Sequence, residues 1–374
     1  MEKIIYLSVN ESSEKINRDF FINKLKKKFK VEFWSIKNLL NHNYKSRKKK
    51  KFNNIYDFEN DVIKNKKNLF INIVPNGYKT YFIFKILSKY NIKFININWG
   101  FLPETKLNYY LKFLSIFNDL RNFVDNFIYK IQIKKKKIKK PIRTFVAGSK
   151  NYQKNFIKFN LCDHDQYLIS KKITSKKKHI IFLDQAMTSH SDTHLNRKKN
   201  LYNQHFYYYK SLNEFFKKTE LKFRKNIVIS KHPLNMIKYN PFKKRKYYTL
   251  KTANLVRESL FVIAHDSLST SYAIFNYKPI IFIYTNQIKN HSIDTHKQYL
   301  QIKVLADTLG SKLLNIDNYK EEELIFNNLD KKKYDDFKYK YLVSKNTEYK
   351  LSSKIFLNNI MKINEKYKKN LHNY

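Results

Sequence analysis

Two polar segments, each of which follows an apolar run, carry side chains suited to binding a phosphate. The first is Lys231-His232-Pro233, directly after the apolar stretch 226–230. Lysine and histidine both contact phosphate, and proline restricts the turn that holds the histidine. The second is the hydroxyl-rich stretch after the apolar run 260–264, whose candidate binding residues are His265, Ser267, Ser269, Thr270 and Ser271.

The hydroxyl-rich stretch precedes a helical pattern at 272–276 and a strand pattern at 280–284. The first turn of a helix has free backbone N–H groups, which together with hydroxyl side chains can hold a phosphate. The alternative is that the hydroxyls only cap the helix. The two polar segments are about 35 residues apart, roughly one βαβ unit. We therefore expect them on neighbouring strands, at the sheet edge where open α/β sheets bind ligands.

These segments resemble the C-terminal half of bacterial GT-B glycosyltransferases that build surface polysaccharides, such as capsule and lipopolysaccharide. The closest likeness is to the sialyltransferase-like and Kdo-transferase-like groups, which use CMP-activated sugars. In those groups a His-Pro motif and a Ser-Ser/Thr motif hold the nucleotide; the matching positions here are His232-Pro233 and Ser269-Thr270, beside Ser267. The stretch 180–193 is similar to the opening of the C-terminal domain in related capsule-type enzymes, with Ser191 where proline is expected. The resemblance covers roughly residues 140–300.

The resemblance implies an α/β fold of GT-B architecture, with two Rossmann-like domains that face a central cleft. We expect an acceptor domain at 1–170, a nucleotide-sugar domain at 171–340 and a helical extension at 341–374. The N-terminal half alternates strand and helix patterns, as a parallel sheet covered by helices requires. Two of the expected helices span 18–29 and 149–160.

The implied activity is transfer of a sugar from a nucleotide-activated donor, CMP-linked by the resemblance, to a growing glycan or a lipid-linked acceptor. Inverting transfer needs a base that deprotonates the acceptor hydroxyl. Glu104, which follows a strand pattern, is the candidate in the N-terminal domain, and Asp184 and Asp192 are the alternatives. We expect no cofactor and no metal, because the chain has no Asp-X-Asp pair placed at a strand end.

The composition leaves room for other classes of protein. The 374 residues have a formal net charge of +46, but only eight of the 76 basic residues are arginine. Nucleic-acid surfaces favour arginine forks, and the abundance of Lys, Asn, Ile, Phe and Tyr is typical of A+T-rich codons. We therefore expect no specific nucleic-acid partner, although a basic nucleic-acid-binding protein remains an alternative. A second alternative is a CDP-polyol phosphotransferase of the teichoic-acid type, which shares the GT-B frame.

One long apolar pattern has two interpretations. Residues 107–133 repeat apolar side chains at helical spacing and are followed by a lysine run. The first interpretation is a core helix packed on the sheet. The second is an amphipathic helix that makes peripheral contact with an anionic membrane. The single cysteine excludes an internal disulfide, and the chain shows neither a signal peptide nor a transmembrane stretch. We expect a cytoplasmic protein.

Overall fold

The chain divides into two compact units. The computed structural model describes residues 3–40, 52–98, 102–105, 124, 127–132, 138–150, 152–153, 156–172, 177–189, 204–233, 235–325 and 329–372. The first unit comprises Met1–Trp99, Ser115–Cys162 and Ser344–Tyr374, and the second comprises Gly100–Leu114 and Asp163–Val343.

The first unit contains a six-stranded sheet in the order β2-β1-β3-β4-β5-β6, and all its strand pairs are parallel. Its strands are β1 (Lys3–Ser8), β2 (Lys30–Ser35), β3 (Leu69–Asn72), β4 (Phe94–Ile97), β5 (Arg143–Ala147) and β6 (Ile157–Phe159). The central strands are almost wholly buried, as expected for a parallel sheet covered on both faces. The strand order reverses between β1 and β3, as in flavodoxin-like sheets.

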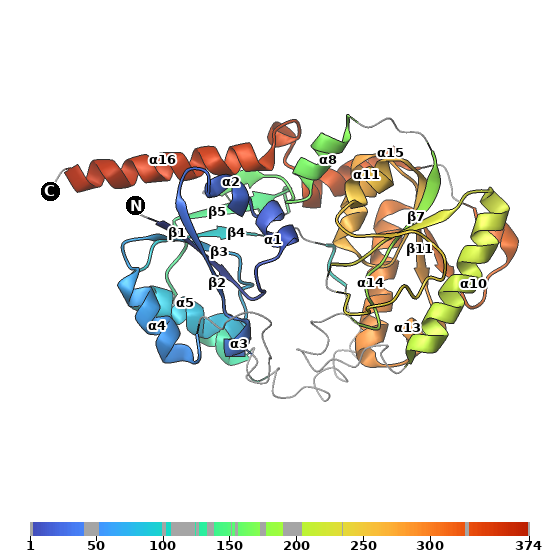
Figure 1. Ribbon diagram of the computed structural model, residues 1–374, viewed down its shortest axis with the longest axis horizontal. Helices are drawn as coiled ribbons and strands as arrows, with labels where there is room; N and C mark the ends of the chain where they lie inside the picture. The colour runs from blue at the N-terminus through green and yellow to red at the C-terminus, as the bar shows by residue number, and fades with distance from the viewer. Residues whose placement is uncertain are drawn as a thin grey trace. The chain divides into compact units, whose positions relative to one another are not determined.

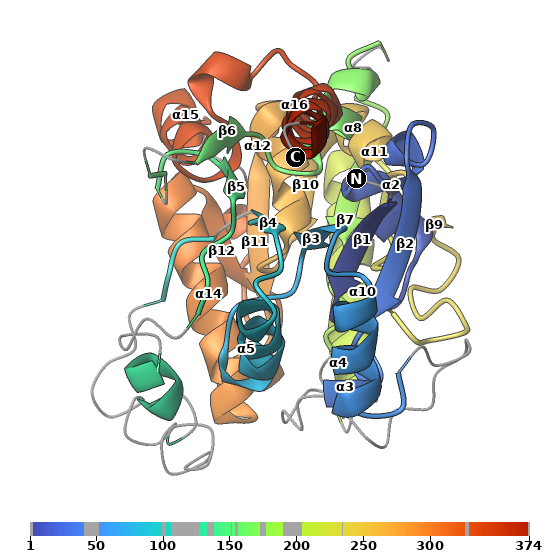
Figure 2. The same ribbon diagram turned by 90° about the vertical axis from the view of Figure 1, so that its left-hand side faces the viewer.

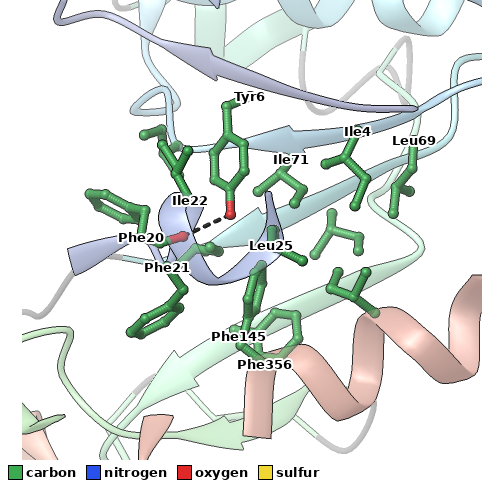
Figure 3. Close-up of a cluster of buried hydrophobic side chains, with 14 of the residues drawn as sticks. Ile4, Tyr6, Phe20, Phe21, Ile22, Leu25, Leu69, Ile71, Phe145 and Phe356 are labelled. Atoms are coloured by element: carbon green, nitrogen blue, oxygen red, sulfur yellow. Dashed lines mark hydrogen bonds between the residues drawn. The ribbon is translucent and has the colours of Figure 1, made fainter. Parts of the chain in front are cut away.

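Helices cover both faces of this sheet (Figures 1 and 2). One face carries α1 (Glu14–Asp19), α2 (Ile22–Leu25) and the C-terminal helix α16 (Ser352–His372). The other face carries α3 (Lys37–Leu40), α4 (Ile55–Lys64) and α5 (Tyr81–Lys89), preceded by the short turn η1 (Tyr78–Thr80). The C-terminal helix therefore shares a core with the first strands of the chain, because Phe356 packs in one cluster with Ile4 and Tyr6 (Figure 3).

Two expected helices in this unit are wrong. The helix expected at 18–29 is broken at Phe21, whose φ of 60° is left-handed, so α1 and α2 form in its place. Phe20 and Phe21 are both buried, although successive residues of a continuous helix would point about 100° apart. The hydroxyl of Tyr6 donates to the Phe20 carbonyl at 2.7 Å (Figure 3). In the range 149–160, where we expected a helix, residues 157–159 form the strand β6, which pairs with β5.

The second unit contains a six-stranded sheet in the order β12-β11-β10-β7-β8-β9, again with every pair parallel. Its strands are β7 (His179–Leu183), β8 (Ile227–Ser230), β9 (Tyr247–Tyr248), β10 (Ser259–Ala264), β11 (Ile280–Tyr284) and β12 (Lys312–Asn315). Read from the β9 edge, this is the Rossmann order 3-2-1-4-5-6, with its reversal between β7 and β10. The predicted α/β class with two Rossmann-like parallel sheets is confirmed.

The connections of the second unit are mostly helical. They include α8 (His164–Ser170), α10 (His205–Phe223), α11 (Thr252–Arg257), η3 (Leu268–Thr270), α12 (Ser271–Phe275), α13 (Asn286–Asn290), α14 (Ile293–Leu309) and α15 (Lys331–Phe337). The long helix α14 starts at a capping box formed by Ser292 and Thr295 and ends at Gly310, whose φ of 60° suits glycine. The short turn η4 (Glu321–Glu323) precedes α15, and a π-helical turn, Lys338–Leu342, follows it. The next turn, η6 (Lys345–Thr347), already belongs to the first unit.

Of the two interpretations of 107–133, the core helix does not hold where the structure describes the stretch. Val124, Phe127 and Ile131 of the apolar pattern are exposed. The remaining apolar positions of the pattern fall outside the described residues. Among the helices that can be described, none combines the length and apolar character needed to cross a bilayer.

Because α16 packs in the core of the first unit, we can predict how a substitution in this helix changes stability. Phe356 is fully buried, and its ring centroid lies 5.0 Å from that of Phe145 and 5.6 Å from that of Phe21. Phe356→Ala should therefore lower the free energy of unfolding by about 3–5 kcal/mol. Tyr56→Ala, at a position of α4 that is 76% exposed, is the control and should change it by about 0.5 kcal/mol or less. Chemical denaturation measures both, and equal effects would show that α16 is not part of the core.

Candidate functional site

The sequence-predicted binding residues lie after three strands of the second sheet. Residues 184–189 (the β7 loop), 231–237 (the β8 loop, of which 234 is not described) and 265–271 (the β10 turn) follow β7, β8 and β10. Because these strands are parallel and adjacent, their carboxyl ends meet at one edge. The β7 loop lies in the middle, so the expectation that the other two segments follow neighbouring strands is wrong. The short edge strand β9, which the sequence pattern did not predict, continues the sheet beyond β8.

Asp184 joins the β7 loop to the β8 loop. Its Oδ1 accepts from the Ala186 amide at 2.9 Å, and its Oδ2 accepts from Asn235 Nδ2 at 2.8 Å. The His232 amide and the Tyr247 hydroxyl approach the same Oδ2 at 3.5 and 3.4 Å. Burial raises the pKa of Asp184, whereas these hydrogen bonds act in the opposite direction. Both oxygens of this carboxylate are thus engaged inside the domain, where they join the β7 loop to the β8 loop.

The β8 loop is held by its backbone and presents one half-buried histidine. The Lys231 amide donates to the Tyr248 carbonyl at 2.7 Å. The Lys231 ammonium lies 5.0 Å from the Tyr247 ring centroid and 3.4 Å from the Ile237 carbonyl, on the β9 side. His232 is half-buried and Pro233 is exposed. The His232 amide thus lies near the Asp184 carboxylate, and the described contacts of Lys231 go to its own loop and to β9.

Within the β10 turn, two hydroxyls serve the turn itself. Ser267 Oγ accepts from the Ser269 amide at 3.2 Å and caps η3. Thr270 Oγ1 donates to the Ser267 carbonyl at 2.7 Å. Ser269 is half-buried. The capping alternative therefore describes the contact of Ser267, which caps η3, whereas Thr270 donates back into the turn without capping α12.

His265 is a core residue and not an accessible ligand in this conformation. It is fully buried, its Nδ1 lies 2.7 Å from the Ile283 carbonyl, and its Nε2 lies 3.0 Å from the Tyr208 hydroxyl. These contacts make Nδ1 the donor and Nε2 the acceptor of a neutral ring. Burial lowers the pKa of His265 to about 4. Both ring nitrogens are thus used inside the domain, which corrects the expectation that His265 contacts the nucleotide.

Three buried polar atoms beside the reversal point have no hydrogen-bond partner: Gln185 Oε1, Asp266 Oδ1 and Ser271 Oγ. Gln185 and Asp266 come from opposite sides of the reversal, and Gln185 Nε2 donates to the Asp266 backbone carbonyl at 3.1 Å. Burial raises the pKa of Asp266 to about 6, against a smaller opposing effect of Gln185. A buried polar atom without a partner costs about 1–3 kcal/mol, so these three, on the segments that follow β7 and β10, are groups that a ligand could satisfy.

Gln185 and Asp266 were not among the residues that we predicted from the sequence. Both are the second residue after their strands, at the two positions that flank the reversal point. The strand patterns locate each of them at a strand end. Only the strand order shows that the two ends are adjacent, and a single sequence does not contain that order.

Neither remaining candidate base lies among these three segments. Glu104 is exposed, in the described stretch 102–105, and the structure groups it with the second unit, not with the first as we expected. There the Pro103 carbonyl accepts from Gln301 Nε2 of α14 at 2.9 Å. Asp192 falls outside the described residues. Within the described ranges, no three His, Cys, Asp or Glu side chains lie close enough together to hold a metal ion.

Comparisons with known proteins give only distant structural likenesses. No protein-family model matches the chain, and no curated protein matches it. MurG from Acinetobacter baumannii is 10% identical over 86% of this chain and 88% of that one, with a TM-score of 0.44. A variant of the wall teichoic acid polymerase TagF is 10% identical over 97% and 90%, with a TM-score of 0.47. UDP-GlcNAc 2-epimerase from Methanocaldococcus jannaschii is 13% identical over 96% and 99%, with a TM-score of 0.42. At TM-scores this low, we draw no conclusion about activity from these similarities.

The raised pKa of Asp266 predicts a pH-dependent stability. Because the folded-state pKa of about 6 lies above the ordinary value of 3.8, the folded protein favours the protonated carboxyl. The stability that the protonated Asp266 carboxyl contributes is then present below about pH 4 and is lost as the pH rises towards 6. Asp266→Asn should remove this loss, so that its advantage over the wild type grows by roughly 2–3 kcal/mol between pH 4 and 7. Urea denaturation across that range measures the difference, and parallel curves would contradict the prediction.

Proposed function

We propose that this protein is a GT-B-type glycosyltransferase whose second unit binds the nucleotide of an activated sugar donor. The reaction breaks the bond between the sugar's anomeric carbon and the donor phosphate, and it forms a bond from that carbon to an acceptor hydroxyl oxygen. The acceptor's proton passes to a base, and the nucleotide leaves with the bonding electrons. The finer proposals are a CMP-linked donor, a growing surface glycan or lipid-linked acceptor, and inverting transfer without a metal.

The observation that supports this proposal best is the group of unpartnered atoms at the reversal of the second sheet. Gln185 Oε1, Asp266 Oδ1 and Ser271 Oγ are buried there without hydrogen bonds. In open α/β sheets, ligands bind outside the carboxyl ends of the strands at the reversal point. The Rossmann order of this sheet puts that point between β7 and β10, from which Gln185 and Asp266 come.

The chemistry of the three atoms favours a ligand that carries both hydroxyls and a phosphate. Gln185 Oε1 is an acceptor, and Asp266 Oδ1 is one when the carboxyl is ionised. Both therefore suit hydroxyl or amine donors such as those of a ribose, a sugar or a base. A carboxylate repels a phosphate, whereas the Ser271 hydroxyl can donate to one. We therefore propose the phosphate on the Ser271 side of the turn, with His232 and Ser269 as further contacts. The ribose or sugar would lie over Gln185 and Asp266.

Other parts of the proposal rest on expectation from the sequence. Glu104, Asp184 and Asp192 remain the proposed bases, and the hydrogen bonds of Asp184 also give it a positioning role. The proposed supporting residues are Lys231, Pro233, Ser267 and Thr270, which would hold the loops of the site in place. The described side-chain contacts of Lys231, Ser267 and Thr270 are made within the protein. Peripheral contact with an anionic membrane would bring the enzyme to a lipid-linked acceptor.

A nucleotide screen tests the proposal and the donor class together. We expect CMP or CDP to stabilise the protein more than UDP or GDP. At a concentration of about 100 times the dissociation constant, the gain in the free energy of unfolding should be roughly 2.7 kcal/mol. Thermal shift measures it. A preference for UDP or GDP would overturn the cytidine donor and leave the transferase proposal standing, whereas no response to any nucleotide would contradict both.

A matched pair of serine variants tests the site itself. Ser271 Oγ is buried without a partner, so Ser271→Ala should not lower the free energy of unfolding and should raise it by about 1–3 kcal/mol. Its affinity for the preferred nucleotide should fall at least tenfold, or about 1.4 kcal/mol. Ser267→Ala is the control, because it removes the cap on the Ser269 amide. That variant should lose about 1 kcal/mol of stability with a smaller change in affinity. Wild-type affinity in Ser271→Ala, measured by calorimetry, would exclude this hydroxyl from the site.

A further inference from the structure

Exposed apolar side chains gather in the described residues 124 and 127–132, which are helical. They are Val124, Phe127, Ile128 and Ile131, which are 46%, 59%, 46% and 39% exposed. Their spacing of i, i+3, i+4 and i+7 places them on one face of a helix. We call this set the apolar stripe.

The segment contacts the first unit through its opposite side. Tyr129 lies on the helix face roughly 140–150° from the centre of the stripe, as follows from about 100° per residue. Its hydroxyl donates to Asn76 Oδ1 at 2.5 Å, and its ring centroid lies 5.7 Å from that of Tyr81, at the start of α5. A surface helix of a globular protein normally turns its apolar face to the core. Here the tyrosine faces the protein and the stripe faces solvent.

The charge around the stripe favours an anionic partner. Lys130 is exposed on the same segment, and Lys140 is exposed a short distance further along the chain. In the sequence, six of the seven residues at 134–140 are lysine, and the whole chain has a formal net charge of +46. A second copy of this chain would carry the same charge, so contact between two stripes would be opposed by repulsion. A nucleic acid would satisfy the lysines but would not cover the apolar stripe.

A partner that is anionic at its surface and apolar beneath it satisfies both features. We propose that the apolar stripe inserts at the boundary between headgroups and acyl chains of an anionic lipid bilayer, with Lys130 and Lys140 at the headgroups. Amphipathic helices with basic flanks bind membranes in this way, through buried apolar area and electrostatic attraction. This inference rests on the membrane contact of the proposed function, but it uses none of the residues of the nucleotide site, so either can fail without the other.

Sedimentation with lipid vesicles tests the inference. The full-length protein should bind vesicles of phosphatidylcholine with phosphatidylglycerol at least tenfold more tightly than vesicles of phosphatidylcholine alone. Phe127→Gln/Ile131→Gln should weaken binding to the anionic vesicles at least tenfold, because burial of one large apolar side chain corresponds to roughly ten- to a hundredfold in affinity. At high salt, the wild type should retain more binding than this variant.

The matched control is Leu221→Gln/Ile325→Gln, which removes two apolar side chains that are 69% and 49% exposed in the second unit. It should bind the vesicles as the wild type does. Both double variants should keep the wild-type melting temperature and nucleotide response, so a failed vesicle test leaves the nucleotide proposal untouched. Equal binding to both kinds of vesicle, or unchanged binding of the stripe variant, would overturn the inference. So would a stripe variant that only dissociates a dimer, because the stripe would then be a contact between copies.

Discussion

The arrangement of the candidate site depends on one buried carboxylate. Asp184 receives hydrogen bonds from its own loop, through the Ala186 amide, and from the β8 loop, through Asn235. Ser189 Oγ adds a second link by donating to Asn235 Oδ1 at 2.8 Å. A buried charge is tolerated only when hydrogen bonds compensate its desolvation, and here the compensating groups are those that must be held. The same interactions that compensate the buried Asp184 thus hold the β7 loop to the β8 loop, which carries His232.

The hydrogen-bonded network around Asp184 adjoins polar groups that keep buried atoms without a hydrogen-bond partner. On the β8 side of β7, the polar groups of Asp184, Ser189 and Asn235 are joined to one another. On the β10 side, Gln185 and Asp266 share one hydrogen bond and each keeps a buried acceptor without a partner. Ala186, between the two sides, has a φ of 53°, which is strained for a residue other than glycine. Strain and unsatisfied polar atoms that occur together beside a rigid network are typical of sites where binding compensates the cost.

The positions of the strands could be predicted well from the sequence, whereas the order of the strands in each sheet could not. The buried runs that became β7, β8, β10 and β11 were recognisable, because a parallel sheet covered on both faces requires continuous apolar residues. The two-residue strand β9 and the three-residue strand β6 are too short to produce a pattern. For the site, the hydroxyl pattern located the β10 turn but did not separate Ser271, which has no partner, from Ser267, which caps a turn. That difference depends on where each hydroxyl points, which residue types do not specify.

The first unit offers an internal comparison that favours the second as the nucleotide-binding unit. Its sheet also reverses, between β1 and β3, and buried polar residues Ser8 and Asn72 end those strands. Ser8 Oγ accepts from the Asn10 amide at 3.0 Å, and Asn72 Nδ2 donates to Asn96 Oδ1 at 2.9 Å. These described polar groups thus have partners within the unit, whereas Gln185, Asp266 and Ser271 each keep an atom without one. Two sheets of the same class therefore differ in the hydrogen bonding of polar residues near the point where their strand order reverses. The unsatisfied one is where a polar ligand would gain most, because its hydrogen bonds would replace none that the protein already makes.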